Sequence, residues 1–316
     1  MPESFLVALR VVAPMTILMV LGAGVRKGGL IDRPTMRKVD VLTFRLFMPV
    51  LLFKNIYETD LSRDFDLREL IFTIVGLAAV FCLALFLPPR LVKDRAQAAS
   101  LGQAVIRSNY ILFGISVAES IYGEGNVGPV ALLGAIVVPA TNAMAVVILE
   151  LGRSGSAKPG RICLSILKNP MVVAALAAFA VLALPWQLPE ILWSLIKDIA
   201  GVTTTISFIS LGVSLDLGET RANRRPLAYG LLLRMVVVPL IFLPLSVLLG
   251  FRGPTLCALM VLFAAPTAVA SYPMAVAMGA DGQLAGQLVC LTTVTSVFTK
   301  LTITLLIVSI AHIIGF

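Results

Sequence analysis

Residues 97–121 read QAASLGQAVIRSNYILFGISVAESI, an apolar stretch long enough to cross a membrane but interrupted at Arg107–Asn109 and at Gly114. An unbroken helix satisfies its own backbone hydrogen bonds, whereas lipid offers no partner to the backbone groups that a break exposes. A break at membrane depth is therefore tolerated only inside protein or beside a water-filled cavity.

Residues 255–279 read TLCALMVLFAAPTAVASYPMAVAMG, a second apolar stretch that is interrupted by Pro266 and Pro273. The two interrupted stretches occupy corresponding places in the two halves of the chain. Interrupted spans in corresponding places are the strongest sequence indication of a transporter's binding site.

The composition is typical of a polytopic membrane protein. Of 316 residues, 59% are hydrophobic and 13% are charged, and the mean hydropathy is +0.99. A soluble domain carries about 25% charged residues. Because a helix needs about 20 apolar residues to span a bilayer, the sequence predicts an all-α fold of ten transmembrane helices, over residues 5–25, 38–57, 67–88, 97–121, 128–150, 162–184, 190–216, 225–250, 255–279 and 284–312.

The net charge of +8 does not indicate a nucleic-acid partner, because the basic residues gather in alternate loops. Fifteen Lys and Arg residues lie in the first, third, fifth and seventh loops, against five in the even-numbered loops. Cytoplasmic loops carry such an excess. Both chain termini are therefore expected outside the cytoplasm.

A linker, GRSGSAKPG at residues 152–160, separates five predicted spans from five others. With an odd number of spans in each half, the second half enters the membrane from the opposite face, so related halves form inverted repeats. We expect a first repeat over residues 1–150, a cytoplasmic linker over 151–161 and a second repeat over 162–316.

Each interruption exposes helix ends within the membrane. The N-terminal ends carry unpaired N–H groups and about half a positive charge, so they can hold an anion without a charged side chain. We expect the second half-helix to begin near Gly114–Ser116 in the first stretch, and after Pro266 or after Pro273 in the second. A carboxylate-sized anion is expected between these ends, whereas the C-terminal ends could coordinate Na⁺ through free carbonyl groups.

Arg107 is the charged residue of greatest interest, because a charge deep within a span is costly and marks a functional site. Its guanidinium could grip a carboxylate through two parallel hydrogen bonds. The alternative is that the long side chain snorkels to the cytoplasmic surface or pairs with an acidic residue of a cytoplasmic loop. Asn109, two residues later, can hold a substrate or bridge the break, since an amide both donates and accepts.

The residues expected to bind substrate all lie at or beside the two interruptions. They are Arg107, Asn109, Tyr110, Phe113, Gly114, Ser116, Pro266, Thr267, Ser271, Tyr272 and Pro273. Residues of other spans are expected to couple ions or to support the site: Asn142, Thr292, Ser296, Thr299 and Lys300. The hydroxyl residues of this second set equally suit helix–helix packing, and Lys300 could serve as a countercharge or replace a coupling cation.

Other classes of function find little support in the sequence. There is no HExxH or GxSxG motif, and His312 is the only histidine, so we expect neither an enzyme nor a metal site or other cofactor. No carboxylate falls at the predicted midplane of a span, which disfavours cation/proton antiport. A channel would need a continuous polar lining, and a receptor would normally carry an effector domain.

Several motifs, in this order and spacing, resemble those of the auxin efflux carrier family across essentially the whole chain. They are FRLFMPVLLFKNIYETDL (Phe44–Leu61), RSNYILFG (Arg107–Gly114), KNPMVVA (Lys168–Ala174), SLGVSLDL (Ser210–Leu217), APTAVASYPMAVAMGAD (Ala265–Asp281) and TTVTSVFT (Thr292–Thr299). Two positions depart from the family pattern. Ser116 follows Gly114 without the usual proline, and Ala270 or Ser271 stands where an Asn is common.

The resemblance implies ten spans in two inverted repeats, the architecture of sodium/proton antiporters and bile-acid symporters. Spans one, two, six and seven would form a scaffold, and spans three to five and eight to ten a transport domain that moves like an elevator. The implied substrate is a small organic anion, either an auxin-like carboxylate or a dicarboxylate, bound where spans four and nine cross.

The resemblance further implies a bacterial plasma membrane protein, a homodimer through the scaffold, and Na⁺ or H⁺ as candidates for coupling. A Na⁺-coupled organic anion carrier of the bile-acid symporter type is the alternative interpretation, because it shares this architecture and this crossing of spans.

Overall fold

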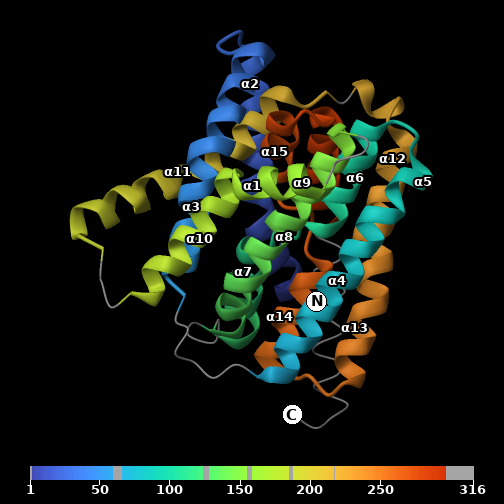
Figure 1. The fold of residues 1–316 in the computed structure, drawn as a ribbon. Helices are drawn as coiled ribbons and strands as arrows, with labels where there is room; N and C mark the ends of the chain where they lie inside the picture. Colours follow the sequence, from blue (N-terminus) through green and yellow to red (C-terminus); the bar gives the residue numbers. More distant parts are fainter. Residues whose placement is uncertain are drawn as a thin grey trace.

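The computed structural model describes residues 2–59, 66–123, 128–154, 159–184, 188–216 and 218–296 (Figure 1). Within these ranges the regular structure is helical, apart from one isolated bridge between two residues. The prediction of an all-helical protein is confirmed for this part of the chain.

The helices follow one another with short connections. Those of the first half are α1 (Pro2–Lys27), α2 (Arg33–Leu42), the π-helix η1 (Thr43–Phe47), α3 (Met48–Tyr57), α4 (Leu67–Phe86), α5 (Pro88–Leu91), α6 (Arg95–Ile106), α7 (Tyr110–Tyr122) and α8 (Gly128–Ser154). Those of the second half are α9 (Pro159–Leu167), α10 (Pro170–Ala183), α11 (Glu190–Ser214), the 3₁₀-helix η2 (Gly218–Arg221), α12 (Arg224–Leu232), the π-helix η3 (Leu233–Val237), α13 (Val238–Leu248), α14 (Gly253–Ala264), α15 (Ser271–Met278) and a last helix over residues 282–296.

Four helical stretches of the described chain are long and apolar enough to cross a membrane by themselves. They are Leu67–Leu91, Gly128–Arg153, Glu190–Ser214 and Arg224–Leu248. Large apolar side chains on their outer faces are exposed, among them Ile74, Ile191 and Leu248. So large an apolar surface is unusual for a protein in water and suits contact with lipid.

Both predicted interruptions are present, with corrected starts for the half-helices. The first stretch divides into α6 and α7, and α7 begins at Tyr110, so a start near Gly114–Ser116 is wrong. Gly114 lies inside α7, where a Cβ atom would come within 2.5 Å of Val130 Cγ1, so this glycine permits close helix packing instead of a break.

The second stretch divides into α14 and α15, and α15 begins at Ser271. The predicted start after Pro266 is confirmed, and the start after Pro273 is wrong. Pro273 stands in the first turn of α15, where its missing N–H would have had no intrahelical partner in any case.

The sixth predicted span is also interrupted, whereas the sequence predicts one span over residues 162–184. Residues 162–184 divide between α9 and α10. Asn169 caps α10, since its Oδ1 accepts a hydrogen bond from the Met171 backbone N at 3.0 Å, and Pro170 occupies the first helical position. An Asn cap followed by Pro is a strong helix start.

The helices pack in two groups. In one group α1 packs along α11, and α3 packs against α10 and α11. In the other, α6 packs against α4 and α8, and α14 packs against α7, α8 and α13. Figure 1 shows α10 and α11 extending to one side of the molecule, while α4 and α13 lie together on the other. Phe72 of α4 and Phe242 of α13 join the latter two helices, with ring centroids 6.4 Å apart.

Two glycines allow α1 and α11 to approach closely. A Cβ atom on Gly212 would lie 2.0 Å from the Met19 carbonyl oxygen, and one on Gly22 would lie 2.1 Å from that of Ile209. Both neighbours are backbone atoms, so either substitution would force the two helices apart. Small residues commonly permit such contacts between membrane helices.

Gly212→Ala is therefore expected to destabilise the protein by about 1–3 kcal/mol, the usual cost of overpacking. The measurement is thermal unfolding in detergent. Gly201→Ala is the matched control, because Gly201 lies on the same helix with nothing within 4 Å of a built Cβ atom. Equal melting temperatures for the two variants would contradict the close packing of α1 on α11.

Candidate functional site

The two unwound segments, residues 107–109 and 265–270, lie side by side and are called here the crossing. Ser108 and Thr267 form an antiparallel bridge. The Asn109 backbone N donates to the Pro266 carbonyl oxygen at 2.8 Å, and the Ala268 backbone N donates to that of Arg107 at 3.2 Å. Each break thus satisfies backbone groups that the other exposes, which lipid could not do.

Two helix N-termini meet at the crossing. α7 starts at Tyr110 and α15 starts at Ser271, directly after the two unwound segments. Each such end carries about half a positive charge. The first N–H groups of α7 have no intrahelical partner, whereas in α15 the Ser271 and Tyr272 backbone N atoms donate to the Ala268 and Val269 carbonyl oxygens, so that α15 contributes its dipole alone. The crossing is consequently electropositive on the side where these two ends lie.

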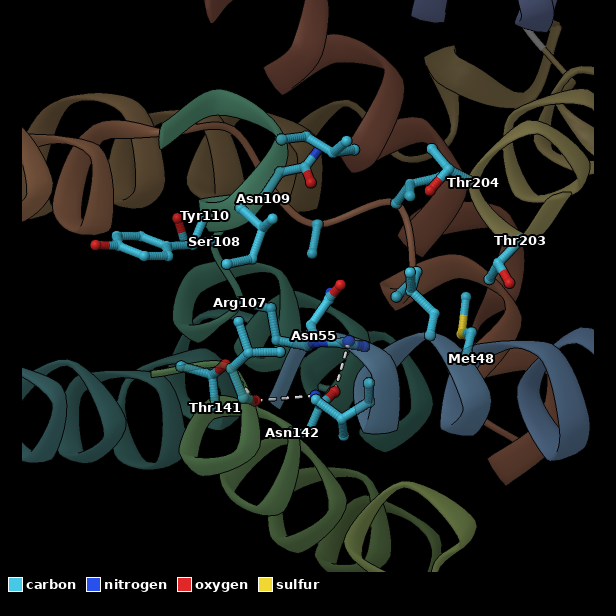
Figure 2. A pocket seen from close by; sticks show the side chains of 18 of the residues that line it. Met48, Asn55, Arg107, Ser108, Asn109, Tyr110, Thr141, Asn142, Thr203 and Thr204 are labelled. Carbon is cyan, nitrogen blue, oxygen red and sulfur yellow. Dashed lines mark hydrogen bonds between the residues drawn. The ribbon is translucent and has the colours of Figure 1, made fainter. Parts of the chain in front are cut away.

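A cavity of about 210 Å³ lies against these N-terminal ends. Figure 2 shows side chains converging on it from both breaks and from the facing helices. Its lining comprises Met48, Leu51, Leu52, Asn55, residues 107–112, Val138, Thr141, Asn142, Met171, Thr203, Thr204, Ser207 and residues 268–270. The cavity therefore lies between the crossing on one side and α3, α10 and α11 on the other.

Arg107 is the cation of this cavity. Its side chain is buried, with 4% of its surface exposed, so it does not snorkel to the membrane surface. Nη2 donates to Asn142 Oδ1 at 2.7 Å (Figure 2). Nη1 contacts Met274 Sδ at 3.1 Å. Asn142 Nδ2 donates to the Val138 carbonyl oxygen at 2.9 Å, an arrangement that turns the amide oxygen toward the guanidinium.

Arg107 has no carboxylate partner among the residues that the structure describes. The ion pairs found there join Arg33 with Asp216, Lys54 with Glu58, and Arg153 with Glu150, all by N–O distances of 2.5 or 2.6 Å. An amide and a thioether leave the guanidinium charge uncompensated. Asn109 adds a donor, because within the described structure its Nδ2 is buried without a hydrogen-bond partner.

Four of the residues predicted from the sequence line the cavity: Arg107, Asn109, Tyr110 and Asn142. The other described members of that prediction lie outside its lining: Phe113, Gly114, Ser116, Pro266, Thr267, Ser271, Tyr272, Pro273, Thr292 and Ser296. Thr299 and Lys300 lie outside the described residues. Phe113, Pro266 and Ser296 instead line a separate, smaller space.

Two threonines support the crossing from behind. Thr267 Oγ1 donates to the Ala104 carbonyl oxygen at 2.9 Å, and the Thr267 backbone N donates to Thr292 Oγ1 at 3.1 Å. These contacts hold the unwound segment of one break against the end of α6 and against the helix over 282–296. Ser116, by contrast, bonds within its own helix, to the Leu112 carbonyl oxygen at 2.9 Å.

Tyr272 points away from the cavity into a buried polar cluster. Its hydroxyl donates to Asp40 Oδ2 at 2.8 Å, and the Ser210 hydroxyl donates to Asp40 Oδ1. Asp40 has 0% of its surface exposed. The cluster links α2 and α11 to α15. Asp40 belongs to no motif and stands near the predicted end of a span, so the sequence does not mark it as part of a site.

The cavity wall opposite the crossing, formed in part by α3 and α11, was not predicted from the sequence. Asn55 falls within a motif that resembles the family, and Thr203, Thr204 and Ser207 form a hydroxyl-rich stretch of α11. Thr203 and Ser207 are four residues apart and so share one helix face. That spacing was a usable signal, although nothing in it indicates which other helix the face contacts.

The comparisons with known proteins agree with this architecture. A family model described as a membrane transport protein matches residues 7–160 and, a second time, residues 158–304. No curated protein matches the sequence. Because the two matches together cover most of the chain, the protein is a multi-pass membrane transporter that belongs to the membrane transport protein family, that of the auxin efflux carriers.

Proposed function

We propose that this transporter carries a small organic anion with one carboxylate and an apolar body, which it binds in the cavity at the crossing. The observation that carries the proposal is Arg107, a buried guanidinium that lines the cavity beside two helix N-termini and lacks a carboxylate partner among the described residues.

The energetic argument concerns the charge of the site. A buried, unpaired charge is strongly disfavoured, so a bound anion would stabilise the site by supplying the missing partner. Hydrogen bonds to charged groups contribute about 1.5–3 kcal/mol each. Donors on Arg107, on Asn109 Nδ2 and at the N-terminus of α7, together with the dipole of α15, are oriented before the ligand arrives, which reduces the cost of ordering them.

The lining supports a monocarboxylate over a dicarboxylate. Arg107 is the one cationic side chain among the lining residues, whereas Leu51, Leu52, Val138 and Met171 offer apolar surface. A second carboxylate would have to be buried against these apolar groups, at the cost that accompanies an unpaired charge. An auxin-like compound, with a carboxylate at one end and an apolar ring, has the matching distribution of polarity.

We further propose ten spans in two inverted five-span repeats, residues 1–150 and 162–316, joined by a cytoplasmic linker over 151–161. The two successive matches of one family model support this division. The two packing groups support a scaffold of spans one, two, six and seven beside a transport domain of the remaining spans. A cavity between the two groups suits elevator-type alternating access.

The remaining proposals follow from the loop charges and from the family. The excess of Lys and Arg in the odd-numbered loops supports a position of both termini outside the cytoplasm. We place the protein in the plasma membrane of a bacterium, as a homodimer through the scaffold.

The test is solute counterflow in liposomes that contain the purified protein. Three solutes are compared: indole-3-acetate, its neutral amide of nearly the same size, and the smaller dicarboxylate malonate. We expect saturable counterflow of the monocarboxylate, with the amide at least about tenfold weaker because it lacks the charge that Arg107 would bind. Equal counterflow of acid and amide, or none for either acid, would refute the proposal.

A further inference from the structure

A second buried arginine lies behind the crossing. Arg234 belongs to the π-helix η3, has 2% of its surface exposed and is not among the residues that line the cavity. Its Nε donates to the Ala265 carbonyl oxygen at 2.9 Å, Nη1 to that of Val105 at 3.2 Å, and Nη2 to that of Leu262 at 3.0 Å. One guanidinium thus binds the C-terminal ends of α6 and α14 together.

The charge of Arg234 matches that of the groups it binds. The last carbonyl groups of a helix have no intrahelical partner, and each C-terminal end carries about half a negative charge. Two such ends, adjacent inside the protein, amount to about one negative charge. A single guanidinium compensates it and also donates to three of the carbonyl oxygens.

Other carbonyl groups at these two helix ends are occupied as well. The Ala104 carbonyl oxygen accepts from Thr267 Oγ1, that of Gln103 from the Arg107 backbone N, and that of Val261 from the Ala265 backbone N. Na⁺ sites in transporters are built from carbonyl groups of unwound segments and of half-helix C-termini. Here the protein's own donors occupy six carbonyl groups at these two helix ends, those of Gln103, Ala104, Val105, Val261, Leu262 and Ala265, which such a site would otherwise use.

The backbone around Arg234 is itself unusual. Residues Leu233–Val237 form a π-helix between α12 and α13. Single π-turns inside α-helices are rare and occur frequently at functional sites. The π-turn η1 carries an arginine too, but Arg45 is exposed. The two residues therefore form a matched pair, one buried at the crossing and one at the surface.

We propose that Arg234 is a fixed internal cation that holds the C-terminal ends of α6 and α14 together in place of a bound metal cation, so that transport by this protein needs no Na⁺. The inference rests on the proposed transport function. Because Arg234 does not line the cavity, it is a positioning residue. By fixing α6 against α14, it keeps the N-termini of α7 and α15 in the relative position that binds the anion.

The first test compares monocarboxylate counterflow in Na⁺ buffer with that in choline buffer. We expect the wild-type rates to agree within about twofold. In the same assay Arg234→Ala is expected to lose at least about 90% of the rate, and millimolar guanidinium to restore part of it. Arg45→Ala is expected to keep the wild-type rate and to show no response to guanidinium. Wild-type transport that requires Na⁺ would overturn the proposal, as would an Arg234→Ala variant with the wild-type rate.

The second test does not depend on transport. Thermal unfolding of Arg234→Ala in detergent is expected to shift to higher temperature with millimolar guanidinium, whereas the wild type and Arg45→Ala do not shift. If Arg234→Ala cannot be purified, Arg234→Lys takes its place, with the same response expected because an ammonium cannot reach three divergent carbonyl groups. Absence of the shift overturns the internal-cation role. A shift without any carboxylate counterflow in the wild type refutes the proposed function alone.

Discussion

Arg107→Gln is expected to weaken the binding of monocarboxylates by at least about 30-fold while leaving the fold intact. Glutamine removes the positive charge but keeps a side-chain amide that can still donate to Asn142 Oδ1, the acceptor of Nη2 at 2.7 Å. Removal of one partner from a buried, hydrogen-bonded charge pair costs about 2–5 kcal/mol. That cost corresponds to an affinity at least about 30-fold weaker.

The measurement is equilibrium binding of a radiolabelled monocarboxylate to purified protein. Arg45→Gln is the control, because Arg45 is also an intramembrane arginine but is exposed. Arg107→Lys is expected to give an intermediate affinity, since an ammonium keeps the charge and loses the planar fork that suits a carboxylate. If Arg107→Gln binds as well as Arg45→Gln, the ligand does not contact Arg107.

The places of both breaks could be predicted from the sequence because local chemistry determines them. Arg-Ser-Asn within one apolar stretch and Pro266 within the other disfavour a continuous membrane helix, and the structure unwinds at residues 107–109 and 265–270. Pro139, by contrast, lies inside α8 without a break, so the paired position of the two stretches was the stronger signal. The starts of the second half-helices could not be predicted with the same accuracy. A glycine such as Gly114 is compatible with either a helix break or a tight packing contact. Which of the two occurs depends on a neighbour from another helix, here Val130, and the sequence does not reveal that neighbour.

The roles of the buried charges lay beyond sequence reasoning for a related reason. Arg45 and Arg234 have the same appearance in the sequence, each within an apolar span near its predicted cytoplasmic end. One is exposed, and the other is buried against Val105 and Ala265. Hydropathy reports how deep a residue lies in the membrane but not which helices surround it, so the sequence alone does not distinguish these two arginines.

The lining of the cavity, too, could be predicted only in part, because the sequence does not reveal which helices lie opposite one another. Residues at the break in the first stretch were predicted, whereas the wall formed by α3 and α11 was not, because it depends on how the two packing groups meet. Figure 2 shows Asn55, Thr203 and Thr204 on that wall, away from the crossing in sequence but facing the same space.

Asn142→Asp is expected to weaken monocarboxylate binding by at least about 100-fold without a loss of stability. The substitution preserves the size of the side chain and supplies Arg107 with the carboxylate that it lacks among the described residues. The bound anion then faces a like charge and a neutralised guanidinium. Two unit charges 4 Å apart interact by about 4 kcal/mol at an effective dielectric constant of 20, which exceeds the 2.7 kcal/mol that corresponds to about 100-fold.

Asn142→Ala is the control that separates the effect of the added negative charge from the effect of losing the amide group. Both variants lose the Asn142 Nδ2 hydrogen bond to Val138, but only the aspartate adds a negative charge. The alanine variant loses a hydrogen bond from the charged Arg107, worth about 1.5–3 kcal/mol, and a neutral one to Val138, worth about 0.5–1.5 kcal/mol. Neither loss opposes the bound anion, since the guanidinium keeps its charge, so the affinity should fall far less than that of Asn142→Asp. Because an ion pair within the site excludes the ligand but not the fold, the aspartate variant should unfold at or above the wild-type temperature while it fails to bind. Similar affinities for the two variants would mean that the ligand does not depend on the charge of Arg107, and the anion assignment of this cavity would then be wrong.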